Sequence, residues 1–283
     1  MERTDGGVHR MMRAGFAGAA VRRIASTLGF MLLALVVITV IWDLSVRGLG
    51  LDSFGTPTPW RVWEWWALEP DSAEHRRVVF DALGVTVRHA LSGYVVGSIV
   101  GIGLAVVFTS APRIERASLP TVLFIQTVPI LAILPLFILI FGRGDLVTTA
   151  IVALTVFFPT LVWVSQGLRS PHPTTVDLFR SLDATRTTVM IRLRFPSAVA
   201  GLFVAARLAV PGALFGAFVA EWLATGDGLG YLVVTSMQAV GGFSPLWAAV
   251  SATTLLTMIA YVAVEIVEAI ALARYDPDQL AAH

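Results

Sequence analysis

Long segments that are almost free of charged side chains limit most strongly what this chain can fold into. A helix needs about 20 mainly apolar residues to cross the hydrocarbon core of a bilayer. The chain is 56% hydrophobic and only 14% charged, whereas a soluble domain carries roughly a quarter charged residues. Six segments meet the requirement: 24–42, 91–109, 117–142, 146–168, 195–220 and 246–273. We therefore expect an all-α membrane protein with six transmembrane helices.

A further apolar piece, 228–240, is too short to cross a bilayer. Gly241, Gly242 and Pro245 follow it and interrupt a helix, so this piece is expected to form a re-entrant or surface helix. The first apolar segment is longer than the core of a signal peptide, and no A-x-A-like cleavage site follows it. We expect it to remain as the first span.

The arginines predict how the spans are oriented. With six spans both termini lie on one side, where 13 of the 20 arginines fall, against six on the other side and Arg207 inside the membrane. Since cytosolic loops carry the excess of positive charge, both termini and the 169–196 loop are expected in the cytosol. Residues 1–23 would be a cytosolic segment and 24–283 a single transmembrane domain. Most tryptophans agree, because they fall near the opposite interface: Trp42, Trp60, Trp63, Trp65, Trp66, Trp222 and Trp247.

Missing residue types exclude several kinds of chemistry. All 20 basic residues are arginine, so the chain has no lysine for a phosphate-binding P-loop or for a Schiff base. Cysteine is absent, and the five histidines lack the spacing of metal ligands. A net charge of +1 argues against nucleic acid as a partner. We expect no catalytic residue, no metal site and no cofactor in this chain.

Charged residues at membrane depth leave alternatives open. Arg207 lies about a dozen residues into the fifth span, where an unpaired charge is costly. It could form a salt bridge with Glu265 or Glu268, or it could face a substrate. Glu221 and Asp227 flank the outer end of this span and are expected to be solvated or capping.

The polar loop between the fourth and fifth spans predicts a helical elbow over 174–196. Thr174 and Asp177 have the spacing of a capping box, and Asp183 permits a turn and can cap a second helix from Ala184. The first helix has an apolar face, formed by Val176, Leu178, Phe179 and Leu182. An exposed apolar helical face rimmed by arginine is typical of a surface that docks into a groove.

The elbow resembles the cytosolic loop of permease subunits of binding-protein-dependent ABC importers. The family motif is Glu-Ala-Ala, three residues, Gly, nine residues, Ile, one residue, Leu-Pro. Its spacing is kept from Asp177-Leu178-Phe179 through Asp183 and Leu193 to Phe195-Pro196, although aspartate replaces the glycine. Other blocks resemble the nitrate/sulfonate/taurine branch: 56–59, 129–142, Phe158-Pro159, 180–182, Ala220-Glu221 and 228–232. The likeness covers about residues 50 to 275.

The resemblance implies a type I ABC importer permease in a bacterial plasma membrane. Its partners would be a dimer of cytosolic ATPases, which hold ATP and Mg, an extracytoplasmic substrate-binding protein, a second copy or a related permease, and membrane lipid. The residues expected to couple the chain to the ATPase are Asp177, Phe179, Arg180, Ser181, Leu182, Asp183, Ala184 and Pro196. The candidates for the substrate pathway are Gln126, Thr127, Pro129, Phe158, Arg207 and Glu221.

Two other functions stay open at this point. A secondary transporter not driven by ATP usually has more spans, often in two related halves with acidic residues at mid-membrane depth. A membrane enzyme needs clustered acids, bases or nucleophiles at depth, and this chain offers few. The branch transports small anions, sulfonates and heterocycles, and the sequence does not choose among them.

Overall fold

The computed structural model describes residues 5–51, 55–238 and 243–275, and within these ranges the regular structure is helical throughout. The long helices are α1 (Asp5–Gly48), α3 (Ser72–Ser110), α6 (Asp145–Arg169), α10 (Val199–Ala224) and α12 (Ser244–Tyr275). The shorter helices are α2 (Pro59–Ala67), α4 (Pro112–Thr127), α5 (Ile130–Phe141), α7 (Pro173–Ser181), α8 (Arg186–Val189), α9 (Phe195–Ser197) and α11 (Gly228–Gln238). A π-helix, η2 (Met190–Arg194), joins α8 to α9.

Five of these helices are long and apolar enough to cross a membrane: Ile24–Gly48, Ser72–Ser110, Asp145–Arg169, Val199–Ala224 and Ser244–Ala271. They confirm five of the predicted spans. The second span is longer than expected, because α3 has 39 residues and extends about 58 Å at 1.5 Å per residue.

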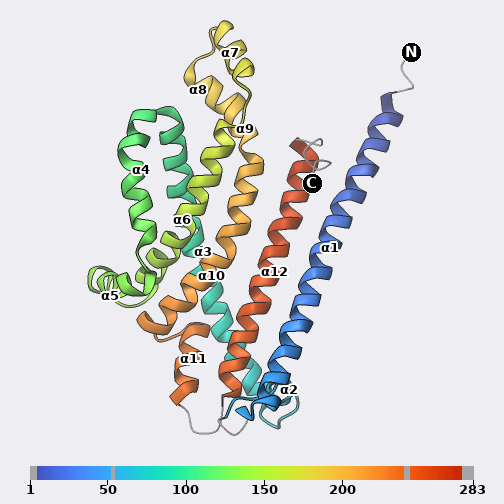
Figure 1. Ribbon diagram of the computed structural model, residues 1–283, viewed down its shortest axis with the longest axis vertical. Coiled ribbons are helices and arrows are strands. Elements are labelled where there is room, and N and C mark those ends of the chain that lie inside the picture. Colours follow the sequence, from blue (N-terminus) through green and yellow to red (C-terminus); the bar gives the residue numbers. More distant parts are fainter. Residues whose placement is uncertain (1–4, 52–54, 239–242, 276–283) are drawn as a thin grey trace.

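The third span predicted over 117–142 is broken into two helices in the structure. α4 and α5 meet at a bend of 102°, and together they make the sixth candidate span. Val128 and Pro129 both adopt extended backbone at the bend, with ψ of 122° and 127°. The steric reason is that a residue before proline avoids the helical region, and proline donates no backbone hydrogen bond. α5 therefore projects from the side of the bundle (Figure 1).

The predicted short helix before the last span is confirmed as α11, which ends at Gln238. The glycine pair Gly241–Gly242 lies outside the described residues, as do residues 1–4 and 276–283 at the two chain ends. The predictions for those residues stay predictions.

The core lies between α3, α6 and α10. Small residues face these contacts, so the backbones approach closely, which is how helices associate where lipid supplies no hydrophobic drive. One buried cluster joins Ala90 of α3 to Val152 and Val156 of α6 and to Ala209 and Ala213 of α10. The core thus holds three spans together, and α1 packs outside it (Figure 1).

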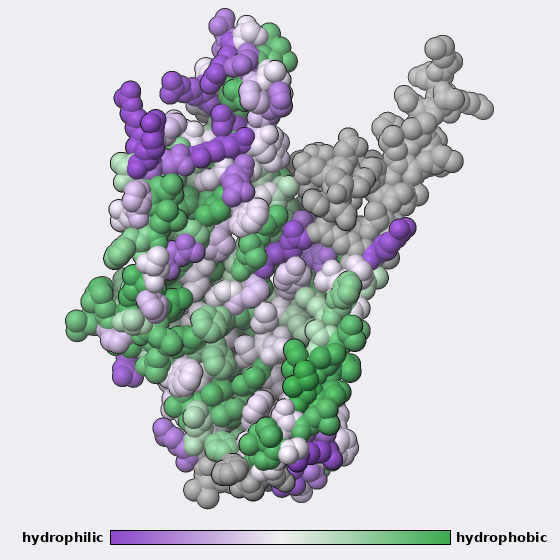
Figure 2. All heavy atoms as spheres, in the orientation of Figure 1, coloured by the Kyte–Doolittle hydropathy of each residue, from purple (hydrophilic) through white to green (hydrophobic). Residues whose placement is uncertain are grey.

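The two ends of the molecule differ in character. α7 and α8 lie at one end, and α2 lies at the other (Figure 1). Near α2, the rings of Trp42 and Trp247 stack 4.5 Å apart, and those of Trp63 and Trp66 are 5.7 Å apart. Figure 2 shows hydrophilic side chains gathered at the α7–α8 end, above a predominantly apolar band.

Candidate functional site

The elbow begins where α6 ends, and histidine rather than threonine caps its first helix. The side chain of His172 accepts a hydrogen bond from the backbone N–H of Thr174. Pro173 occupies the first turn, where its missing N–H costs nothing. The predicted capping box is therefore wrong, because Asp177 instead pairs with Arg180 at 3.2 Å.

The turn after α7 has the geometry that a glycine normally provides. Asp183 has φ of 54°, in the left-handed region. Its N–H donates to the carbonyl of Arg180, and the N–H of Ala184 donates to the carbonyl of Phe179, both at 3.0 Å. This pair of bonds is the Schellman motif, which closes a helix with a left-handed residue. Aspartate tolerates that backbone better than most residues, so the turn is kept although the glycine is not.

In the second half of the elbow, the short helices α8, η2 and α9 follow one another without a gap. Thr185, not Asp183, caps α8, since its side chain accepts from the N–H of Thr188 at 3.1 Å. The following π-helix ends with the N–H of Phe195 bonded to the carbonyl of Met190. Pro196 comes directly after it inside α9. Helical backbone therefore continues on both sides of Pro196, which was predicted from the sequence to be one of the coupling residues.

Two leucines of the elbow face outward. Leu178 is 57% exposed and Leu182 is 73% exposed, whereas Val176 is buried. The predicted apolar face is therefore divided between a side that packs inward and a side that remains open. The hydroxyl of Ser181 donates to the carbonyl of Leu178. Beside the exposed leucines, the side chains of the Arg180–Asp177 pair are both about 70% exposed. The pair therefore contributes little to the free energy of folding, and either side chain could pair with a partner protein instead.

Arginines fix the elbow to the spans beneath it. Arg194 donates to the carbonyl of Leu168, near the C-terminal end of α6, at 3.1 Å, and Arg169 pairs with Glu115 of α4 at 2.7 Å. Burial, followed by the positive charges of Arg180 and Arg169, lowers the pKa of the Arg194 guanidinium from its ordinary value. The positive charges of Arg169 and Arg180 therefore act on Arg194, and this basic side of the elbow favours an acidic partner surface.

The structure brings together only some of the predicted pathway residues. Gln126 and Phe158 line a cavity of about 130 Å³ with Thr155. Pro129 starts α5 at the bend and is not among the residues that line this cavity. Thr127 is exposed, and its hydroxyl donates to the carbonyl of Phe124.

Arg207 lies on a different face of the bundle interior, toward α12. Its guanidinium is 3.0 Å from the carboxylate of Glu268, and both side chains are largely buried. Of the alternatives that the sequence left open for Arg207, the structure shows the salt bridge, with Glu268 as the partner. The buried carboxylate offsets the cost of placing the arginine at this depth.

A buried polar network around Glu221 was not predicted. Of the two roles expected for Glu221, solvation is wrong because its side chain is fully buried. Capping agrees with the structure, since the carboxylate accepts from an N–H in the first turn of α11. One carboxylate oxygen accepts from the hydroxyl of Thr86 at 2.8 Å and from the N–H of Gly230 at 3.1 Å. The other lies 2.9 Å from Nδ1 of His89. The network therefore joins α10 to α3 and to the start of α11.

The network continues to the surface. Nε2 of His89 lies 3.1 Å from the carboxylate of Asp145 at the start of α6, and Arg88 contacts the same carboxylate at 3.2 Å. A histidine with protons on both ring nitrogens can donate to both carboxylates. In the sequence, Glu221 stood out only as a candidate for the substrate pathway, within the blocks 220–221 and 228–232 that resemble the family, and nothing indicated its buried partners.

Glycine allows α11 to lie against this network. Gly228 has φ of 87°, and a side chain there would meet the carboxylate of Glu221. At Gly230, a side chain would meet the carbonyl of Phe218. The backbone of α11 can approach α10 this closely only because these two positions lack a Cβ atom.

Comparison with known proteins places these features in a family. A family model described as a binding-protein-dependent transport system inner membrane component matches residues 79–270. The formylaminopyrimidine transport permease protein ThiX of Halalkalibacterium halodurans is 30% identical over 211 residues, which cover 74% of this chain and 82% of the relative.

Two further relatives are more distant. A probable ABC transporter permease protein of Haemophilus influenzae is 26% identical over 72% of this chain and 80% of the relative. The putative aliphatic sulfonates transport permease protein SsuC of Bacillus subtilis is 28% identical over 71% of this chain and 72% of the relative.

Proposed function

Because the chain belongs to the family of binding-protein-dependent transport system inner membrane components, we propose that α7 and the turn at Asp183 are the surface through which a cytosolic ATPase drives it. The chain is a multi-pass membrane permease of an ABC importer. Permeases of this kind work with an ATPase and a substrate-binding protein. The site that couples the permease to the ATPase therefore has to be a surface to which a second protein can bind.

One observation supports the elbow most strongly as the surface that couples to the ATPase. Two exposed leucines lie next to the Schellman turn, at the end of the molecule. Leu178 and Leu182 are one helical turn apart and both face outward. Exposed apolar side chains flanked by Arg180 and by the basic base of the elbow suit a groove with an apolar floor and an acidic rim. Phe179, Ser181 and Ala184 would then act by holding the turn, through the bonds described above.

The proposed assembly places the elbow in the cytosol, because most arginines lie at that end. ATP and Mg would be held by a dimer of ATPases, and hydrolysis would take place there. A second permease, either another copy or a related chain, would complete the pathway. The α5 side of the bundle suits such a contact, since Leu139 of this projecting helix is 82% exposed.

Replacing Leu178 or Leu182 with aspartate should abolish capture of the ATPase encoded beside the gene. Each leucine is worth about 1.5–3 kcal/mol when fully buried, so affinity should fall at least about tenfold. The test is co-purification from mild detergent, quantified per chain inserted in the membrane.

Ile114→Asp provides the matched control. Ile114 is also an exposed apolar residue, on α4, so this variant adds the same charge outside the elbow. ATPase capture that survives in both leucine variants, or that is lost equally in the control, would contradict the assignment of the elbow.

For the substrate, the cavity at the α4–α5 bend favours an uncharged heterocycle over a sulfonate. Phe157, Phe158 and Pro159 offer apolar surface, and Gln126 and Thr155 offer neutral polar groups. The residues that line the cavity include none with a formal charge, so a sulfonate would find no cation there. The relative that transports a formylaminopyrimidine agrees with this choice.

In liposomes that contain the ATPase and the loaded binding protein, uptake of an aminopyrimidine should exceed uptake of an alkanesulfonate. Gln126→Ala should raise the KM for the pyrimidine roughly 3- to 10-fold, the loss expected for one hydrogen bond. Thr127→Ala serves as the control, because the Thr127 hydroxyl bonds its own helix. Preferential uptake of the sulfonate would overturn this substrate class and leave the ATPase coupling untouched.

A further inference from the structure

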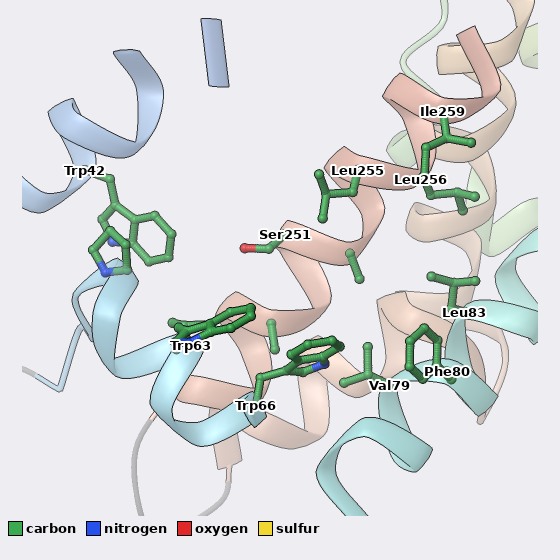
Figure 3. A pocket seen from close by; sticks show the side chains of 14 residues that line it. Trp42, Trp63, Trp66, Val79, Phe80, Leu83, Ser251, Leu255, Leu256 and Ile259 are labelled. Atoms are coloured by element: carbon green, nitrogen blue, oxygen red, sulfur yellow. The ribbon is translucent and has the colours of Figure 1, made fainter. Parts of the chain in front are cut away.

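A large apolar pocket lies at the end of the bundle opposite the elbow. Its volume is about 550 Å³, and residues of α1, α2, α3 and α12 line it. Trp42, Trp63, Trp66 and Phe80 contribute aromatic rings (Figure 3). Three of the four helices are candidate membrane spans, and tryptophan concentrates at the depth of lipid headgroups. The pocket is therefore placed where lipid meets the protein, away from the cavity at the α4–α5 bend.

One hydroxyl group points into this apolar space. Ser251 of α12 directs its oxygen into the pocket (Figure 3). Hydroxyl groups on membrane helices usually bond the carbonyl four residues earlier, and Thr253, Thr254 and Thr257 of α12 all do so. Among the residues that the structure describes, no hydrogen-bond partner is found for the Ser251 hydroxyl. It is free to donate to a ligand.

A cation lies beside the same pocket. The guanidinium of Arg76 is 5.9 Å from the centre of the Trp66 ring and donates one hydrogen bond to the carbonyl of Trp66 at 3.2 Å. Arginine carries five N–H donors, so most remain available. Within the described ranges Arg76 forms no ion pair, whereas its neighbour Arg77 faces Asp81 at 3.8 Å. An arginine without a carboxylate partner suits a phosphate group.

We propose that this pocket binds one anionic phospholipid from the leaflet opposite the elbow. An acyl chain fills the space between the tryptophans and α12, the hydroxyl of Ser251 donates to an ester carbonyl, and Arg76 contacts the phosphate. The bound lipid fills the gap between α1, α2 and α12 and thereby joins the first span to the last. An apolar helix of a second permease could fill the pocket but would offer no anion to Arg76.

The test is native mass spectrometry of the full chain, purified in mild detergent and titrated with phosphatidylglycerol or with phosphatidylcholine of the same acyl chains. The wild type should retain one phosphatidylglycerol more tightly than phosphatidylcholine. Arg76→Gln should lower the affinity for phosphatidylglycerol about tenfold, the loss expected for one charge-assisted hydrogen bond, and should abolish the preference. Ser251→Trp should abolish retention by filling the pocket.

Thr254→Trp is the matched control. Thr254 is an exposed hydroxyl residue on the same helix, and it does not line the pocket. Equal lipid retention in the two tryptophan variants would overturn the proposal, and so would a preference for phosphatidylglycerol that survives Arg76→Gln.

A milder variant keeps the test decisive if Ser251→Trp does not fold. The sequence contains no cysteine, so Ser251→Cys can be labelled alone with a benzophenone maleimide and irradiated in membranes. An added mass equal to one phospholipid supports the proposal. A covalent dimer of the chain would show that protein covers the pocket and would overturn it.

Discussion

Replacing Gly97 with alanine should separate α3 from α6 and strongly destabilise the folded permease. A methyl group built at Gly97 lies 2.5 Å from the carbonyl oxygen of Ala153 and 2.9 Å from Cβ of Val156. The first of these atoms belongs to the backbone of α6, so no side-chain rotation relieves the contact. Overpacking of a core typically costs about 1–3 kcal/mol, and occasionally more. The measurement is the temperature at which the purified protein unfolds in detergent, together with its yield.

Gly103→Ala makes the same chemical change on the same helix without the contact. No atom lies within 4 Å of a methyl group built at Gly103, so this variant should be neutral, or stabilised by up to about 1 kcal/mol through helix propensity. If Gly97→Ala unfolded at the same temperature as Gly103→Ala, the close contact between α3 and α6 would not limit the stability of the protein.

The bend at Val128–Pro129 could not be predicted from hydropathy. Hydropathy located the spans, because the bilayer demands a length of apolar residues that few other structures require. It could not show which proline ends a helix. Pro120, Pro135, Pro159 and Pro211 all lie inside helices, whereas Pro129 begins one. Neighbouring helices decide this difference, since they supply or withhold partners for the freed backbone groups.

The overall form of the elbow was predicted from the sequence, but the residues that cap its two helices were not. Its start, its turn at Asp183 and its apolar residues were all located from sequence. His172 and Thr185 cap the two helices instead of Thr174 and Asp183, each two residues away. Several side chains with lone pairs compete at each helix start, and the backbone conformation of the loop selects one of them. Asp183 does not act as the N-cap of α8, because it adopts the left-handed conformation of the preceding turn.

Glu221 was missed for a different reason. Its partners Thr86 and His89 are 135 and 132 residues away in the chain, so no local pattern could associate them. α10 also continues to Ala224, and α11 then folds back so that Gly230 donates to the same carboxylate. A charged residue beyond a predicted span end is normally solvated, and this tertiary contact reverses that expectation.

Replacing Glu221 with leucine should therefore destabilise the protein by about 3–5 kcal/mol, the cost of removing one partner from a buried charged pair. The loss removes the carboxylate that accepts from the hydroxyl of Thr86 and from the N–H of Gly230 and that pairs with Nδ1 of His89. The effect should be seen as a lower unfolding temperature and as faster amide hydrogen exchange in α11. Glu64→Leu is the control, because Glu64 forms only an exposed pair with Arg61, worth up to about 1 kcal/mol.

A double variant distinguishes a specific network from general sensitivity of the region. Once Glu221 is leucine, the cost of His89→Leu should be much smaller than in the wild type, because the histidine has already lost its buried partner and an apolar pair can replace a buried ion pair at little cost. Additive losses would mean that the two residues act independently. A strong departure from additivity would establish that α10 and α3 are joined through this one carboxylate. This carboxylate would then link α3 and α10 toward the end of the permease opposite the elbow (Figure 1).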